Sequence, residues 1–192
     1  MYSFRNDYSE GAHPKVLQAL VDTNLKQTCG YALDPMSGAA RETIRRVCAA
    51  PEADVHFLAG GTQTNLLTIA AFLRPYEAVI APYTAHISLH EAGAIEATGH
   101  KVCAVETPDG KLTPAMVAAV ADGHTDEFMV HPRMVYISDS TELGTIYTKA
   151  ELTALRRCCD ERGLYLFLDG ARLGSALTAS GTDLTLPDLP AL

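Results

Sequence analysis

The chain has 192 residues, with 15 lysines and arginines against 23 aspartates and glutamates and a formal net charge of −8. Hydrophobic residues make up 47% and charged residues 20%, which excludes a disordered chain and favours a globular one. The acidic balance lacks the basic surface that binds nucleic acid or an anionic membrane, so we expect neither partner. The length suits one domain.

The five cysteines are odd in number and form no Cys-x-x-Cys pair. This pattern argues against a disulfide framework and a structural zinc site, and we expect no metal ligand set. The longest apolar run, residues 66–73, is far shorter than the roughly 20 residues that cross a membrane, and the N-terminus carries no secretory signal. We therefore expect a cytoplasmic protein.

Short apolar runs alternate along the chain with segments of helical spacing. This alternation predicts an α/β layer fold whose central strands are mostly parallel. In chain order, the sequence predicts helices that begin at Pro14 and Ser37, a strand over 54–58, a helix from Thr62, strands over 78–81 and 102–105, a helix from Thr113-Pro114, a strand over 134–138, a helix whose capping box joins Thr148 to Glu151, and a strand over 165–168.

A glycine-containing turn is predicted between the first strand and the helix that begins at Thr62. Gly60 and Gly61 let the backbone approach an anion, and the free amides and dipole of the following helix favour negative charge. The turn lacks the lysine of a P-loop and the Gly-x-Gly-x-x-Gly pattern, which disfavours a nicotinamide- or SAM-binding domain. We interpret it as a phosphate cradle, with an ordinary strand-to-helix turn as the alternative.

Three other polar segments follow predicted strands, at the edge where open α/β sheets bind ligands. His86 could stack on a planar ligand, or it could be a half-buried histidine satisfied by backbone. Residues 138–144 form either a binding loop or a plain turn. Asp169 ends an apolar run and Arg172 follows it, so the two could hold a cationic ring nitrogen and a substrate carboxylate, whereas Asp169 could also simply cap a helix.

These four places occur in one order and together resemble the large domain of threonine aldolases, within the β-eliminating lyases of pyridoxal 5'-phosphate (PLP)-dependent fold type I. The resemblance implies a three-layer α/β fold with a mostly parallel sheet, as in the aspartate aminotransferase-like large domain of PLP-dependent transferases. Residues 1–192 would then hold an N-terminal arm and most of the PLP-binding large domain, without the C-terminal small domain. The resemblance is carried by Phe4–Asp7, Tyr31–Pro35, Gly60–Thr62, His86, Glu91–Gly93, Thr141–Gly144 and Asp169–Gly174.

The resemblance implies cleavage of L-threonine, L-allo-threonine and related 3-hydroxy amino acids to glycine and an aldehyde, with PLP as cofactor. His86 and Asp169 would be catalytic: His86 would stack on the pyridine ring and assist with the proton of the substrate hydroxyl, and Asp169 would pair with the ring nitrogen. The residues that would bind the cofactor are Gly60, Gly61, Thr62, Gln63, His86, Asp169 and Arg172.

The resemblance also implies how the substrate is bound and how subunits assemble. Arg172 would reach the substrate carboxylate or a cofactor oxygen. Asn6 stands where the family often has serine, and Tyr31 resembles a residue that the family contributes across a dimer interface. These residues form the expected substrate site, and the expected assembly is a homodimer or homotetramer.

The sequence departs from the family pattern in two places. The family's Schiff-base lysine is expected after the Asp169 segment, and no lysine follows Asp169, so we expect this chain alone to be inactive. Phe128 stands where the family places a further histidine, and His124 or His131 is only a loose substitute. Two alternatives stay open: another amino-acid β-eliminating lyase of this fold, since cofactor residues do not fix the bond cleaved, and a lysine-less homologue that acts as a binding or oligomerisation partner.

Overall fold

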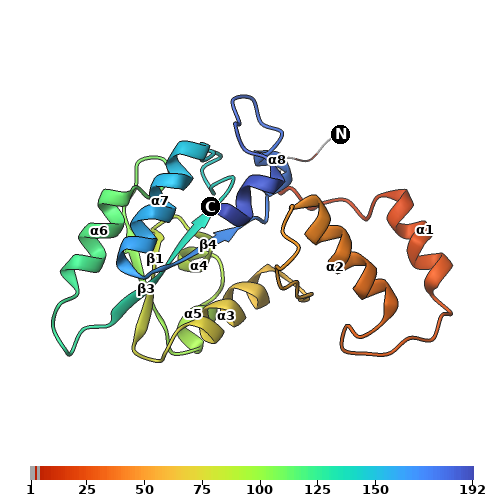
Figure 1. The fold of residues 1–192 in the computed structure, drawn as a ribbon, viewed down its shortest axis with the longest axis horizontal. Helices are drawn as coiled ribbons and strands as arrows, with labels where there is room; N and C mark the ends of the chain where they lie inside the picture. Colours follow the sequence, from red (N-terminus) through yellow and green to blue (C-terminus); the bar gives the residue numbers. More distant parts are fainter. Residues whose placement is uncertain (1–2, 4) are drawn as a thin grey trace. The chain divides into compact units, whose positions relative to one another are not determined.

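The structure, a computed structural model, describes residue 3 and residues 5–192, so Phe4 lies outside the described residues. The chain divides into two units, residues 1–43 and 44–192, where the length suggests one. The sheet and the predicted phosphate cradle both belong to the second unit (Figure 1).

The helix α1 (Pro14–Thr23) begins where the sequence predicts, because the His13 ring accepts a hydrogen bond from the Lys15 amide and Pro14 takes the first helical position. The next helix, α2 (Pro35–Val47), begins two residues before the predicted start at Ser37. The carboxylate of Asp34 accepts hydrogen bonds from the Ser37 amide at 2.8 Å and from its hydroxyl at 2.6 Å. Asp34 therefore does the capping that the prediction gave to Ser37.

Four of the five predicted strands form one sheet in the order β2-β1-β3-β4, and every neighbouring pair is parallel. The fifth prediction, a strand over residues 54–58, is wrong, and this segment is an extended loop. A strand needs a neighbouring strand to pair with, and the composition of a segment does not show whether one is present. Phe57 and Leu58 are accordingly 45% and 44% exposed. The strands are β1 (Glu77–Pro82), β2 (Lys101–Val105), β3 (His131–Ser138) and β4 (Tyr165–Asp169).

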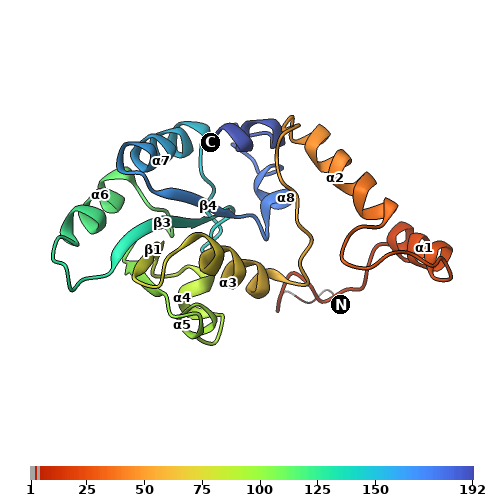
Figure 2. The ribbon, with the colours of Figure 1, turned by 60° about the horizontal axis from the view of Figure 1, so that its bottom comes forward.

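Helices cover both faces of the sheet, as Figure 2 shows. On one face lie α3 (Gly61–Phe72), α4 (His86–Leu89) and α5 (Ala94–Ala97), and on the other lie α6 (Pro114–Gly123) and α7 (Lys149–Arg162). The Thr113 cap of α6 and the Thr148–Glu151 capping box of α7 are confirmed, whereas α3 begins one residue before the predicted Thr62. The chain ends with α8 (Leu173–Ala176) and a short 3₁₀ helix (Leu186–Ala191).

Two clusters of buried side chains pack against the sheet, one on each face. Successive residues of a strand point to opposite faces and so contribute to the two clusters in turn. On β3, Met134 and Tyr136 pack with Ile69 of α3, while Val135 and Ile137 pack with residues of α6 and α7. Each helical layer thus has its own core against the shared sheet, which confirms the predicted three-layer α/β fold. The same alternation puts Phe167 of β4, and by parity Asp169, on the α3 face.

The strand order reverses direction between β1 and β3. The chain leaves β1 for β2 on one side, and then returns past β1 to form β3 and β4 on the other side. In open parallel sheets a crevice forms at the carboxyl ends of the two strands where the order reverses. The ends of β1 and β3, followed by His86 and by residues 138–144, are therefore the place where this fold exposes a site.

Candidate active site

The N-terminus of α3 presents backbone amides that are free to bind an anion. The first helical hydrogen bond runs from the Thr64 amide to the Gly60 carbonyl at 2.9 Å, so the amides of Gly61, Thr62 and Gln63 have no acceptor within the helix. A side-chain carbon at Gly60 or Gly61 would meet no atom within 4 Å, so no neighbouring residue packs against the Cβ positions of these two glycines. The Gln63 side chain instead fixes the turn, because its oxygen accepts from the Ala59 amide at 2.9 Å.

Asp169, the last residue of β4, has its carboxylate held by three donors. Its Oδ2 accepts from the Tyr136 hydroxyl at 2.5 Å and from Asn65 Nδ2 at 3.2 Å, and its Oδ1 accepts from the Ala171 amide at 2.9 Å. Burial, together with the neighbouring Asp169 charge, raises the pKa of Tyr136, so this phenol stays protonated and remains a donor. The carboxylate is thus fixed in orientation, with acceptor capacity left on Oδ1.

His86 opens α4 just past β1 and is held at both its ring and its backbone. The ring Nδ1 lies 2.8 Å from Glu91 Oε1, and the Glu91 side chain is 0% exposed whereas that of His86 is 39% exposed. A carboxylate can only accept, so Nδ1 carries the proton of the neutral ring and Nε2 is the bare nitrogen. The His86 amide donates to Glu142 Oε1 at 2.9 Å, and that oxygen also accepts from the Ser138 hydroxyl at 2.8 Å.

Asn65 connects Asp169 to His86. Its Nδ2 donates to Asp169 Oδ2 at 3.2 Å and to Glu91 Oε1 at 2.7 Å, and Glu91 in turn holds the His86 ring. We call Asp169, Asn65, Glu91 and His86 the Asn65 network. Asn65 also lies four residues after Gly61 on α3, about 6 Å along the helix axis, so the network reaches the first turn of that helix.

The site therefore joins three of the predicted groups: the glycine turn with Gly60 to Gln63, His86, and Asp169. Glu91 Oε2 and Glu142 Oε2 are buried and have no hydrogen-bond partner within the described residues. Buried carboxylate oxygens without a donor are energetically unfavourable.

The three predicted substrate residues, Arg172, Asn6 and Tyr31, lie in two different parts of the chain. Arg172 caps α8 in the turn that follows Asp169. Asn6 and Tyr31 belong to residues 1–43: the Asn6 side chain accepts from the Tyr8 amide and the Ser9 hydroxyl, and Tyr31 is 99% exposed. Asn6 and Tyr31 thus lie in a different unit from the Asn65 network, and their role stays a prediction.

The histidines named as loose substitutes do not reach this site. His131 begins β3 and the site lies beyond its last residue, Ser138, about 23 Å along the strand. Phe128 precedes β3 and is 83% exposed, and His124 ends α6, where its Nδ1 pairs with the Val120 carbonyl. His86 is thus the predicted histidine that the structure places beside Asp169.

Sequence reasoning missed Asn65 and Tyr136 and did not assign Glu91 to the site. One signal was available for Asn65, because it is a polar residue one turn after the cradle glycines, just before the apolar run 66–73. For Tyr136 the one available signal was that it lies two residues before Ser138 in the same strand, so both side chains are on the same face of the sheet. Nothing in the sequence predicts that its hydroxyl meets Asp169.

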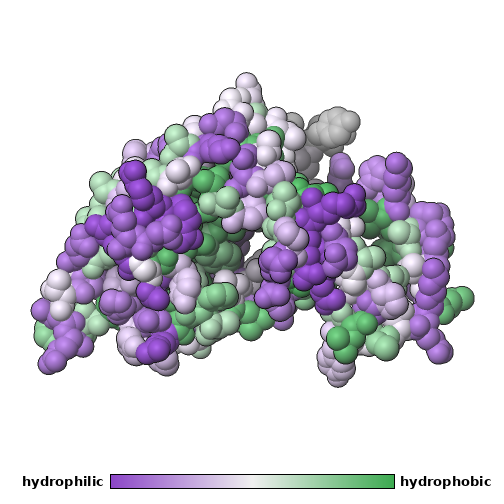
Figure 3. All heavy atoms as spheres, in the orientation of Figure 1, coloured by the Kyte–Doolittle hydropathy of each residue, from purple (hydrophilic) through white to green (hydrophobic). Residues whose placement is uncertain are grey.

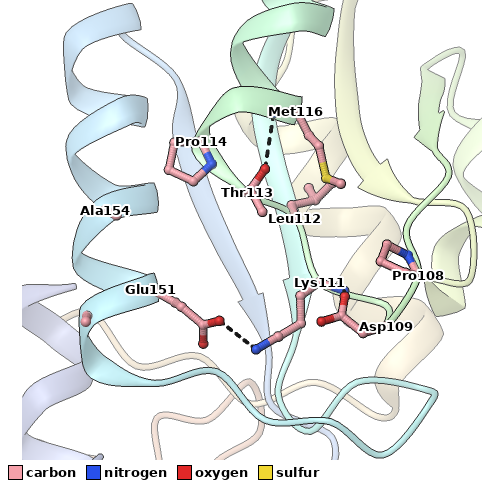
Figure 4. Close-up of a pocket in the computed structure, with 10 residues that line it drawn as sticks. Pro108, Asp109, Lys111, Leu112, Thr113, Pro114, Met116, Glu151 and Ala154 are labelled. Carbon is pink, nitrogen blue, oxygen red and sulfur yellow. Dashed lines mark hydrogen bonds and ion pairs between the residues drawn. The ribbon is translucent and has the colours of Figure 1, made fainter.

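A pocket lies on the opposite face of the sheet from the Asn65 network, between the starts of α6 and α7 (Figure 4). This pocket has a volume of about 370 Å³, and Lys111 Nζ in its wall is paired with Glu151 Oε1 at 2.6 Å. Lys149 is likewise paired with Asp188, and Lys101 begins β2, away from the carboxyl ends of the strands. None of these three lysines contacts the Asn65 network in the described residues.

No helix in the described part of the chain is both long and apolar enough to cross a membrane. No three His, Cys, Asp or Glu side chains among residue 3 and residues 5–192 converge so that they could hold a metal ion.

A parallel α/β sheet with a fixed carboxylate, an imidazole and helix amides at its switch point is typical of a domain that binds small molecules. The model of the family described as beta-eliminating lyase matches residues 4–185. The chain belongs to the beta-eliminating lyase family.

Known proteins resemble the chain over nearly its whole length. It is 34% identical over 180 residues to the low specificity L-threonine aldolase of Pseudomonas aeruginosa, covering 93% of this chain and 52% of that relative. The solved structure of Leishmania major threonine aldolase matches with a TM-score of 0.98 and 52% identity, over 100% of this chain and 56% of that one. The PLP-bound C-S lyase from Staphylococcus hominis, 12% identical over 95% of this chain and 47% of its own, shares the fold with a TM-score of 0.66. The chain thus spans about half the length of these relatives.

Proposed function

We propose that the protein is a PLP-dependent aldehyde-lyase of the threonine-aldolase type. It would cleave L-threonine, L-allo-threonine and related 3-hydroxy amino acids to glycine and an aldehyde. The observation that carries this proposal is the Asn65 network, which holds a strand-end carboxylate and an imidazole beside a helix N-terminus. The similarity to the Pseudomonas aeruginosa and Leishmania major threonine aldolases supports the same reading.

The described residues fit PLP at three points. The free amides of Gly61, Thr62 and Gln63 suit a phosphate at a helix N-terminus, with Gly60 leaving room for its approach. Asp169 Oδ1 retains acceptor capacity for a protonated ring nitrogen. His86 offers a half-exposed ring whose orientation is fixed by Glu91. Each feature complements one part of the cofactor: phosphate, ring nitrogen and ring face.

The protein's own groups would then divide the work as follows. PLP, when bound, supplies the electron sink for the bond broken at the substrate Cα. Asp169 would keep the ring nitrogen protonated, and Tyr136 and Asn65 hold Asp169 in place. His86 would stack on the cofactor ring, and its Nε2 would be the nitrogen available to take the substrate hydroxyl proton, since Nδ1 is bound to Glu91. Arg172 orients the substrate carboxylate, as guanidinium groups pair well with carboxylates.

A panel assay tests this function. The protein, expressed from its complete gene and supplied with PLP, is incubated with L-threonine, L-allo-threonine, phenylserine and cysteine. We expect glycine and the matching aldehyde from the first three substrates, and none without PLP. Release of pyruvate from cysteine with no aldehyde from the others would instead support an amino-acid β-eliminating lyase, the second candidate that the family membership favours. No product from any substrate, with PLP bound, contradicts both.

Gly61→Asp tests the phosphate cradle. An aspartate in the first helical turn is favourable for the helix dipole, and its Cβ meets no atom, so the variant should fold as well as the wild type. Its charge would repel the phosphate, and we expect the Kd for PLP, measured by absorbance titration, to rise about tenfold or more. Gly11→Asp adds the same charge at a position with equally open space and should leave the Kd unchanged. An unchanged Kd in Gly61→Asp contradicts the cradle.

We further propose that the protein works as a homodimer or homotetramer. The support is an apolar stripe on α1, where Val16, Leu17, Leu20 and Val21 are 51% to 69% exposed and recur with helical spacing. Apolar side chains also reach the surface elsewhere in residues 1–43, as Figure 3 shows. A contiguous exposed apolar face is typical of a protein–protein interface.

Leu20→Glu tests this assembly. A charge in the α1 stripe should weaken association at least about tenfold, because burying an unpaired carboxylate is unfavourable, and sedimentation velocity should show a shift toward monomer. Ala19→Glu adds the same charge outside the stripe, four residues after Lys15, and should leave the sedimentation profile as in the wild type. A wild-type protein that sediments as an active monomer contradicts the proposed assembly.

A cytoplasmic location completes the proposal. All five cysteines are free, Cys103 is buried, and Cys158 and Cys159 are buried in the apolar core between the sheet, α6 and α7. Free thiols are typical of a reducing compartment. Fractionation of the native cells tests this, and recovery from an oxidising compartment would contradict it.

A further inference from the structure

Asn65 is a buried polar residue on the face of α3 that packs against the sheet. Its exposed fraction is 2%, and the other buried residue of this helix is the apolar Ile69. Burying an amide is unfavourable unless its donors and acceptors are paired, so an asparagine at this position must have a specific use.

The Asn65 amide nitrogen donates both of its protons to carboxylates. One goes to Glu91 Oε1 at 2.7 Å and the other to Asp169 Oδ2 at 3.2 Å. Both neighbours are carboxylate oxygens, which only accept, and this fixes the amide with its nitrogen between them. The two acids come from segments far apart in the sequence, and their like charges would repel without a donor between them.

Glu91 passes this constraint on to His86. The same Oε1 that accepts from Asn65 also accepts from the ring Nδ1 at 2.8 Å, and the Glu91 side chain is 0% exposed. Without Asn65, Glu91 would have one hydrogen bond fewer and Asp169 would keep the Tyr136 and Ala171 donors. Asn65 therefore acts on His86 and Asp169 together, although it touches no reacting group itself.

We propose that Asn65 is a positioning residue, whose single amide nitrogen holds Asp169 and the Glu91–His86 pair in one arrangement and so aligns the two groups that would face the PLP ring. The part of the inference that concerns PLP rests on the proposed function. The alignment itself is a property of the protein without cofactor.

Two variants test the proposal. Asn65→Leu keeps the branched shape of the side chain and removes both donors. Asn65→Asp keeps the shape but can donate at most one hydrogen bond, and only when protonated. Thr68→Val, three residues further along α3, removes a hydroxyl outside the network and serves as the matched control. Circular dichroism identifies any variant that fails to fold, in which case the other variant is used.

The first readout is the tautomer of His86 in the cofactor-free protein. The ¹⁵N shifts of both ring nitrogens, assigned with His86→Phe, should show the proton on Nδ1 in the wild type and in Thr68→Val. In the Asn65 variants we expect a mixture of the two tautomers, because Glu91 is no longer held in place. A wild-type ring protonated on Nε2, or an unchanged tautomer in the folded Asn65 variants, overturns the proposal.

The second readout is the Kd for PLP, measured by absorbance titration. We expect it to rise about 10- to 100-fold in Asn65→Leu and to stay unchanged in Thr68→Val, because a hydrogen bond to a charged group is lost. A change in tautomer with an unchanged Kd would contradict the claim that Asn65 aligns His86 and Asp169 for PLP. If the wild type binds no PLP, the proposed function fails, and the tautomer alone then decides whether Asn65 positions His86.

Discussion

Asp169→Asn should lower kcat with L-threonine about 10²- to 10³-fold in the presence of saturating PLP. The carboxylate accepts from Tyr136, Asn65 and Ala171, and an amide at this position would turn its own NH₂ group toward one of those donors. It would also leave the ring nitrogen without the charge that favours its protonated form. Steady-state aldehyde release and the absorbance of bound PLP measure the two effects.

The control for this substitution is Asp126→Asn, which makes the same change at an exposed position before β3. It should retain the wild-type kcat and the wild-type unfolding midpoint. If Asp169→Asn remained folded and fully active, Asp169 would not face the reacting cofactor, and the assignment of the site would be wrong.

His86→Phe should lower kcat about 10²- to 10⁴-fold while changing PLP affinity much less. Phenylalanine keeps a flat ring that can stack on the cofactor, but it removes Nε2, the atom expected to take the substrate hydroxyl proton. Glu91 loses the Nδ1 donor and keeps the Asn65 donor, so the pocket stays partly ordered. Comparing kcat with the Kd for PLP in one variant separates proton transfer from stacking.

His131→Phe is the matched control, because His131 begins β3 at the end of the sheet away from the site. It should leave kcat and the Kd unchanged. A large loss in His131→Phe together with an active His86→Phe would show that a different histidine handles the proton.

Much of the site could be predicted from local sequence rules. Asp169 was identified because a buried apolar strand ends in a carboxylate, and β4 runs from Tyr165 to Asp169. The cradle was identified because glycines precede a helix, and α3 begins at Gly61 with Gly60 as its cap. Each of these two signals is confined to a few consecutive residues of the chain, which is why it can be recognised from the sequence alone.

The partners of these residues could not be predicted, because they depend on register between distant segments. Asn65 lies 104 residues from Asp169. It meets the carboxylate only because α3 packs on the face of the sheet to which β3 and β4 contribute Tyr136 and Phe167. The strand expected over 54–58 failed for the same reason, since an apolar run becomes a strand only when a neighbour pairs with it. The shift of α2 from Ser37 to Pro35 was a local error, since Asp34 had the cap signature as well.

A crystal structure of the protein with PLP bound tests the account most directly. The pyridine nitrogen should lie within hydrogen-bond distance of Asp169 Oδ1, about 3 Å, with the phosphate on the amides of Gly61 to Gln63 and the His86 ring against the pyridine face. Density that places the ring nitrogen against another group, or the phosphate away from the first turn of α3, would contradict it.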